Sequence, residues 1–267
     1  MTEQAVSDIW AVGAAYEPYI GRWSRLVARE FVDWLAVSPN ADWLDVGCGS
    51  GALTEAILAS SAPAIVRAVD ASAGFVTYAR QKARDSRAAF AAADARALPW
   101  TSASVDVIVS GLVINFVPQP ERAIAEMARV ARPGAVIGAY VWDYAAGMQL
   151  IRYFWDVAVA LSADAAALDE ANRFPLCQPT ALEELWRGAG LRNVTSCALE
   201  VPTYFRDFDD FWTPFLGGQG PAPSYAMSLE PHRRDELRDQ LRRTLRTESD
   251  GTIALTARAW AVRGFRR

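Results

Sequence analysis

The stretch "WLDVGCGSGALT", residues 43–54, decides the fold. An apolar run is followed by three glycines that alternate with small residues, and then by residues that favour a helix. Glycine has no Cβ atom, so the chain can turn sharply there and let a ligand approach the helix that follows. Gly47, Gly49 and Ala52 match the loose dinucleotide pattern G-x-G-x-x-G/A. The stretch therefore predicts a strand, a ligand-binding turn and a helix, without identifying the ligand.

Strand-like and helix-like segments alternate on the C-terminal side of this stretch. We expect strands over residues 43–46, 65–69, 88–92, 105–109 and 135–141. We expect helices over 52–60 and 73–84, and a third from Pro120 that stops at Arg132-Pro133-Gly134. Strands and helices that take turns across short loops predict an α/β fold, with a mostly parallel sheet covered by helices on both faces.

The two ends of the chain differ from this alternating core. Apolar residues at helical spacing predict an amphipathic helix over 23–35. After residue 142, Thr180 to Glu183 form a capping-box pattern that opens a helix closed by Gly190. We expect a strand over 194–204, a charged helix over 231–246 and a last strand over 252–262. One domain is predicted: a helical cap (1–38), a cofactor-binding core (41–141) and an acceptor-side and C-terminal part (142–267) with an insertion (205–248) before the last strand.

Composition narrows the class of protein. The 267 residues are 52% hydrophobic and carry a formal net charge of -4, so no basic surface is expected for nucleic acid. The N-terminus does not read as a signal peptide, and the longest apolar stretch, 105–117, is too short to cross a bilayer, so we expect a cytoplasmic protein. The three cysteines form no CxxC pair, which argues against a disulfide framework or a metal site. Whether the protein is a monomer or a homodimer is left open.

Three aspartates follow the first three predicted strands. Asp45 precedes the glycine turn and would repel a pyrophosphate, which favours a ligand that is cationic at that end. Asp70 lies 19 residues beyond Gly51, where a carboxylate can accept hydrogen bonds from ribose hydroxyls. Asp94 closes the third strand, from which it could accept a hydrogen bond from an adenine amino group. The three together indicate a nucleoside ligand.

The motifs resemble those of a known family. "WLDVGCGSGALT", "VDAS", "DARALPW", "VDVIVSGLVINFVP" and "RVARPGA" stand in the order found in the Rossmann-like, class I S-adenosylmethionine-dependent methyltransferases. The resemblance is to the small-molecule branch, similar to ubiquinone and menaquinone biosynthesis methyltransferases, and covers about residues 41–141. It implies S-adenosylmethionine as the cofactor. It also implies a seven-stranded sheet whose last strand is antiparallel and inserted between the fifth and sixth.

The resemblance also implies roles for individual residues. Gly47 and Gly49 would pass the methionine part of the cofactor, with Ser110 and Gly111 beside it. The ribose would be held at Asp70 and Ala71, and the adenine at Asp94 and Ala95, while Asp45 would face the cationic end. Tyr16, Tyr19 and Arg22 precede a helix that commonly folds over the cofactor in this family, which makes Arg22 a candidate for the cofactor and Tyr16 and Tyr19 candidates for the acceptor. Asn115 stands where the family often has a histidine, which puts any role of that histidine in doubt here.

Candidates for the acceptor side follow the fifth strand. Trp142, Asp143 and Tyr144 come directly after it, and ligands of open α/β sheets bind beyond the carboxyl ends of the strands. If a base is needed, the candidates are Asp143, Tyr16 and His232 in falling order. Residues 210–225, with Trp212 and several glycines, read as a lid over the acceptor or, alternatively, as a packed surface loop.

The predicted function is methyl transfer from S-adenosylmethionine to a small, apolar or aromatic acceptor. The sulfonium is already activated, so the protein mainly has to align the reacting atoms and exclude water. Two alternatives stay open at this point: a module that binds the cofactor without catalysing transfer, and a nicotinamide-dependent oxidoreductase. Asp45 and the order of the later motifs count against the oxidoreductase.

Overall fold

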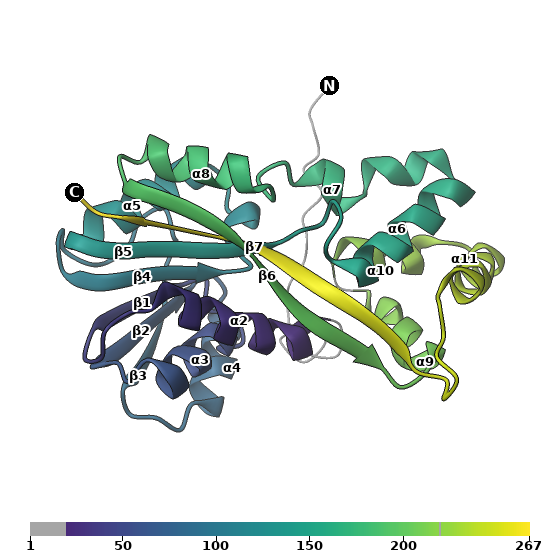
Figure 1. The fold of residues 1–267 in the computed structure, drawn as a ribbon, viewed down its shortest axis with the longest axis horizontal. Coiled ribbons are helices and arrows are strands. Elements are labelled where there is room, and N and C mark those ends of the chain that lie inside the picture. Colours follow the sequence, from purple (N-terminus) through teal and green to yellow (C-terminus); the bar gives the residue numbers. More distant parts are fainter. Residues whose placement is uncertain (1–19, 219) are drawn as a thin grey trace.

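The computed structural model describes residues 20–218 and 220–267, and it is built on one seven-stranded sheet (Figure 1). The strand order is β3-β2-β1-β4-β5-β7-β6, in which β7 is antiparallel to both of its neighbours and the other pairs are parallel. The strands are β1 (Asp42–Val46), β2 (Ile65–Asp70), β3 (Ala88–Ala92), β4 (Val105–Gly111), β5 (Ala131–Trp142), β6 (Arg192–Phe205) and β7 (Ile253–Phe265). The expected fold class is confirmed, including the insertion of the last strand between the fifth and sixth.

Helices cover both faces of the sheet (Figure 1). One face carries α2 (Arg22–Leu35), α3 (Ala52–Ser60) and α4 (Ala73–Lys82), and the other carries α5 (Pro120–Val130) and α8 (Pro179–Gly188). The helix α2 forms as expected, because Trp23, Val27 and Phe31 place one apolar stripe against the sheet and are buried there. The strand β1 lies in the interior of the sheet between β2 and β4, which explains why its residues from Trp43 to Val46 are buried.

The antiparallel pair β6 and β7 extends beyond the parallel strands toward a group of helices at the other end of the molecule (Figure 1). In β7, Ile253, Leu255 and Ala257 alternate with exposed or half-buried residues, so one face of the strand packs against the core as expected. The helices of this end are α6 (Gln149–Leu161), α7 (Glu170–Arg173), α9 (Phe208–Trp212), α10 (Pro221–Ser228) and α11 (Pro231–Thr244), with the 3-10 turns η3 (Ala163–Ala167) and η4 (Thr213–Gly217).

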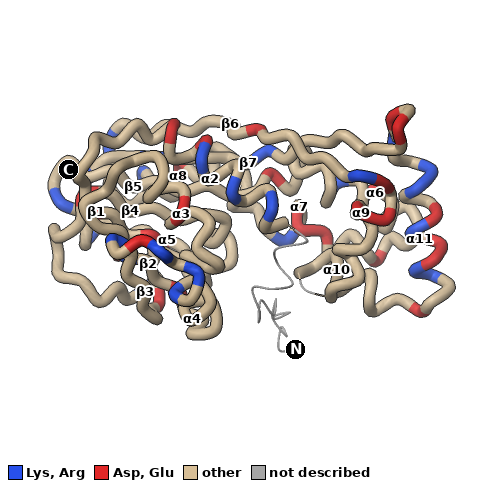
Figure 2. The backbone as a smooth tube through the Cα atoms, turned by 90° about the horizontal axis from the view of Figure 1, so that it is seen from below, with Lys and Arg blue, Asp and Glu red and all other residues tan. Residues whose placement is uncertain are grey.

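Charged side chains of both signs follow one another along α11 (Figure 2). Arg238 pairs with Asp235 and Asp239, each at 2.9 Å, and Arg233 pairs with Glu236 at 3.2 Å. The opposite side of the helix buries Leu237 and Leu241. None of the helices in the described part of the chain has the length and hydropathy of a bilayer-spanning segment.

Three local expectations were wrong. The segment Arg132-Pro133-Gly134 lies inside β5, where Gly134 adopts a φ of 81° and the pairing with β4 shifts register, so it forms an irregularity in the strand. No capping box opens α8, because the helix begins at Pro179 and the Glu183 carboxylate accepts hydrogen bonds from Ser196 and Arg187. Residues 210–225, which were expected to form a lid or a surface loop, are mostly helical, since they include the 3-10 turn η4 and the start of α10 at Pro221.

Candidate active site

The glycine turn after β1 has the backbone that the sequence predicts. Gly47, Gly49 and Gly51 all have positive φ angles (78°, 50° and 93°), which residues with a side chain rarely adopt. A Cβ atom at Gly47 would lie 2.5 Å from Cγ1 of Val113, whereas one at Gly49 would meet nothing within 4 Å. At Gly47 a side chain would clash with Val113. At Gly49 the positive φ disfavours a side chain, and the open space beside the backbone leaves it accessible to a ligand.

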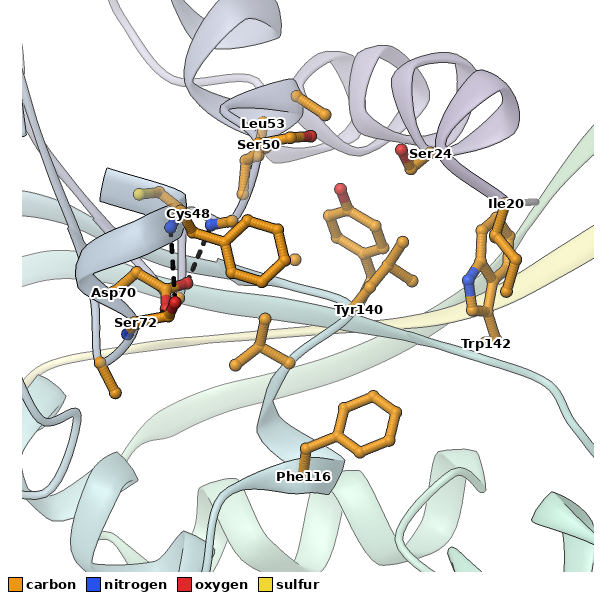
Figure 3. Close-up of a pocket in the computed structure, with 18 of the residues that line it drawn as sticks. Ile20, Ser24, Cys48, Ser50, Leu53, Asp70, Ser72, Phe116, Tyr140 and Trp142 are labelled. Carbon is orange, nitrogen blue, oxygen red and sulfur yellow. Dashed lines mark hydrogen bonds between the residues drawn. The ribbon is translucent and has the colours of Figure 1, made fainter. Parts of the chain in front are cut away.

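Asp70, the last residue of β2, fixes this turn from the neighbouring strand (Figure 3). The Gly49 N–H donates to one carboxylate oxygen at 2.9 Å, and the Ser72 N–H donates to the other at 2.8 Å. Burial raises the pKa of Asp70, although these two hydrogen bonds act in the opposite direction. Each oxygen has a further lone pair, so the carboxylate can hold the turn and still accept from a ligand hydroxyl.

A cavity of about 260 Å³ opens beside this turn, at the carboxyl ends of the central strands (Figure 3). Seven residues predicted for the cofactor or acceptor line it: Gly47, Gly49, Asp70, Ala71, Gly111, Trp142 and Tyr144. Asp70 and Ser72 lie at one end in Figure 3, while Phe116 and Trp142 lie away from them across the cavity. A polar, glycine-lined end and an aromatic end thus share one space.

Several lining residues were not assigned to the site by sequence reasoning. They are Ile20, Ser24, Cys48, Ser50, Ala52, Leu53, Ser72, Phe75, Leu112, Val113, Phe116 and Tyr140. Most of them directly follow β1, β2 or β4, so their place after a strand could have indicated them. Ile20 and Ser24 could not be found that way, because α2 reaches the cavity only through tertiary packing.

Asp45 and Ser110 lie beneath the cavity and do not line it. One Asp45 oxygen accepts a hydrogen bond from the Thr54 hydroxyl at 2.7 Å, and the other has no partner within the described residues. Burial, aided by the nearby negative charge of Asp70, raises the pKa of Asp45 to about 7. The Ser110 hydroxyl is also buried without a described partner. Both groups leave unused hydrogen-bonding capacity directly under the glycine turn.

Other predicted cofactor residues lie outside the cavity lining. Asp94 is paired with Arg96 at 2.7 Å, and the hydrogen bonds from Arg96 lower its pKa to about 2. Ala95, its neighbour, packs against the core. Arg22 pairs with Asp210 at 3.3 Å, and its guanidinium lies over the rings of Trp23 and Phe205. The structure thus places Arg22 at the junction of α2, β6 and α9.

The candidate bases and the predicted lid are also placed away from the cavity. Asp143 is buried in an ion pair with Arg258 at 2.7 Å, so its carboxylate is already engaged. His232 is exposed near the start of α11. Trp212 is buried and packs against Phe215, with the two ring centroids 5.9 Å apart. Tyr16 and Tyr19 lie outside the described residues. Among the described candidates, none is placed to remove a proton from a ligand in the cavity.

Comparisons with known proteins agree with this geometry. Residues 44–138 match the model of the methyltransferase domain family. Demethylmenaquinone methyltransferase of Roseiflexus sp. is 33% identical over 165 residues, which are 57% of this chain and 68% of that protein. Malonyl-[acyl-carrier protein] O-methyltransferase of Hahella chejuensis is 30% identical over 129 residues, 48% of this chain and 46% of the relative.

A solved structure has the same fold. Phosphoethanolamine N-methyltransferase 2 of Haemonchus contortus, in complex with S-adenosylmethionine, superposes with a TM-score of 0.56 at 15% identity, covering 95% of this chain and 56% of that one. The chain spans about half the length of several curated relatives that it matches, with 46%, 44% and 44% of three of them covered. The sequence identity, the motifs and the fold place the chain in the class I S-adenosylmethionine-dependent methyltransferases, whose methyl donor is S-adenosylmethionine.

Proposed function

We propose that the chain transfers the methyl group of S-adenosylmethionine to a small, uncharged, apolar or aromatic acceptor. The observation that carries this proposal is the single cavity with two chemically different ends. The glycine turn and Asp70 bound one end, and Phe116 and Trp142 bound the other. A donor and an acceptor bound side by side in one cavity can be held with their reacting atoms in contact.

The residues present fit the cofactor. The open space beside Gly49 gives a ligand access to the backbone, and the Asp70 carboxylate is fixed where ribose hydroxyls could donate to it. Asp45 does not line the cavity, so it supports the glycine turn from beneath and is not counted among the cofactor contacts. Phe75, which also lines the cavity, offers an aromatic surface to a purine.

The chemistry asks little of the protein beyond alignment. The bound cofactor supplies a methyl group that its sulfonium has already activated. The cavity walls would orient the acceptor for in-line displacement and keep water out, which are the contributions expected of a largely apolar site. This reading agrees with the absence of a proton acceptor at the cavity among the described candidate bases.

The relatives carry two different acceptors in their names, malonyl-[acyl-carrier protein] and demethylmenaquinone. The lining favours the second kind of chemistry. Among the described residues, no lysine, arginine or histidine lines the cavity, and residues 1–19 contain none of these side chains in their sequence. A carboxylate acceptor would therefore find no cationic side chain in the lining, and only the sulfonium of the bound cofactor would offset the cost of its desolvation. An uncharged aromatic ring meets matching surfaces.

Calorimetric titration and a methyl-transfer assay test the proposal. We expect S-adenosylmethionine and S-adenosylhomocysteine to bind and NAD not to bind. With radiolabelled S-adenosylmethionine, we expect label in a short-chain demethylmenaquinone analogue and none in malonyl-[acyl-carrier protein]. Binding of NAD without binding of S-adenosylmethionine would overturn the cofactor. Transfer to the malonyl substrate alone would overturn the class of acceptor.

A further inference from the structure

The indole of Trp142 carries an unused hydrogen-bond donor in the wall of the cavity. Its Nε1 is buried and has no hydrogen-bond partner within residues 20–218 and 220–267. A buried N–H without a partner destabilises the fold, and folded proteins retain few of them. The nitrogen is shielded from solvent, so a partner has to come from a group that packs against the indole.

Trp142 differs from the other tryptophans with the same property. Nε1 of Trp43 and Nε1 of Trp260 are also buried without a described partner. Trp43 lies in β1 and Trp260 in β7, and neither lines the cavity, whereas Trp142 does. In Figure 3 the indole nitrogen of Trp142 lies on the side of the ring that faces the other labelled residues of the cavity. Only at Trp142 can a bound small molecule supply the missing acceptor.

The surroundings of Trp142 restrict what that molecule can be. The Ser24 hydroxyl already donates to the carbonyl of Gly21 at 2.7 Å, and the Ser72 hydroxyl accepts from the Phe75 N–H at 3.4 Å. Asp70 is the only carboxylate among the described lining residues, and its oxygens accept from the Gly49 N–H of the glycine turn and from the Ser72 N–H. The indole N–H is therefore a neutral donor, and no cationic side chain among the described lining residues accompanies it.

We infer that Trp142 selects the acceptor by donating its indole N–H to an uncharged oxygen of that molecule, such as the carbonyl or hydroxyl of an aromatic compound. The inference rests on the proposed function, since it assigns this end of the cavity to the methyl acceptor. A neutral donor suits a neutral oxygen, while a carboxylate would gain one hydrogen bond and lose its hydration. Trp142 is thus a specificity-determining residue, and an acceptor without such an oxygen forgoes the contact.

A matched pair of ligands tests this directly. The bicyclic ketone 1-tetralone and its parent hydrocarbon tetralin have nearly the same shape and differ in one carbonyl oxygen. Binding is measured with S-adenosylhomocysteine present, by following the indole N–H signals in ¹⁵N–¹H correlation spectra. The Trp142 signal is the one missing from the Trp142→Phe variant, which keeps an aromatic ring and removes the donor.

We expect 1-tetralone, and not tetralin, to move the Trp142 indole proton downfield. Trp142→Phe should weaken 1-tetralone by about two- to tenfold and leave tetralin unchanged, as the loss of one hydrogen bond predicts. Trp260→Phe is the control, because it removes a similar orphan donor outside the cavity. An unshifted Trp142 signal with 1-tetralone, or equal weakening of both ligands, would overturn the inference.

The cofactor arm of the experiment is read separately. Titration with S-adenosylhomocysteine alone tests the proposed function, and the comparison of 1-tetralone with tetralin is repeated on the cofactor-free protein. A protein that binds S-adenosylhomocysteine but treats the two bicyclic ligands alike retains its proposed function and loses the role assigned to Trp142. A protein that discriminates the two ligands but does not bind S-adenosylhomocysteine loses its proposed function and keeps the ligand selectivity assigned to Trp142.

Discussion

Asp70 holds the glycine turn through the Gly49 N–H, accepts a second hydrogen bond from the Ser72 N–H after β2, and still faces the cavity. We expect Asp70→Ala to weaken the binding of S-adenosylmethionine by about 1 to 3 kcal/mol, because ribose hydroxyls lose a charged acceptor and the turn loses its tie. Isothermal titration measures the change. Affinity within about twofold of the wild type would remove Asp70 from the site.

Asp94→Ala serves as the companion variant. Asp94 closes β3 as Asp70 closes β2, but it is exposed and already paired with Arg96. The prediction that Asp94 holds the adenine requires it to leave this pair or to share it. A loss of affinity as large as that of Asp70→Ala would support the adenine role, and an unchanged affinity would confine the cofactor contacts to the residues that line the cavity.

Two glycines of the same turn should respond differently to a side chain. Gly49→Val places a branched side chain in open space at a positive φ, so we expect lost cofactor binding with a fold that survives the backbone strain. In Gly47→Val the new Cβ atom would lie 2.5 Å from Cγ1 of Val113, which is a clash, so we expect a lowered melting temperature as well. Tight binding by Gly49→Val would mean that the ligand lies elsewhere.

These residues were predictable because a motif fixes backbone geometry locally. Gly47, Gly49 and Asp70 were found from spacing alone, since a glycine turn and the next strand end must come together in a parallel sheet. The acceptor end was only partly predictable. Trp142 ends β5 and Tyr144 follows it, and both line the cavity as expected, whereas Ile20, which precedes α2, reaches the cavity through tertiary packing that no local pattern encodes.

The strands β1 to β4 were predicted closely because each is a short run bounded by turn residues, whereas β5, β6 and β7 are longer than predicted. The errors arose where side chains interact over long sequence distances. The Glu183 carboxylate does not cap α8 because it accepts a hydrogen bond from Ser196 of β6. Pro221 begins a helix in a segment whose composition predicts a loop. Such competition between local signals and tertiary contacts is what a pattern in a single sequence cannot resolve.

The segment expected to form a lid packs its aromatic side chains into the protein. Phe211 and Phe215 are fully buried, Phe215 stacks on Phe154 of α6 at 4.6 Å, and Trp212 lies against Phe215. We therefore expect Trp212→Ala to lower the free energy of unfolding by about 3 to 5 kcal/mol, as truncation of core aromatics does. Urea denaturation measures this loss. A variant with unchanged stability and reduced turnover would restore the lid interpretation.

Over the whole molecule, two buried acids make stability depend on pH. Burial raises the pKa of Glu170 from 4.5 to about 8, and Nε1 of Trp155 donates to its carboxylate. Asp45 is raised from 3.8 to about 7 in the same direction. Between the unfolded and folded pKa values the native state binds more protons than the unfolded state. Stability therefore falls as the pH rises through that window, and the full cost is present above the folded pKa.

Glu170→Gln removes one of these two groups while keeping an oxygen that can accept from Trp155. We expect the melting temperature of the wild type to be lower at pH 9 than at pH 6, and the variant to lose less over the same interval. The slope that remains in the variant should belong largely to Asp45 and should be confined to pH values below about 7, where Asp45 titrates. Equal losses in both proteins between pH 7 and 9 would show that Glu170 is ionised in the fold, held by groups other than Trp155.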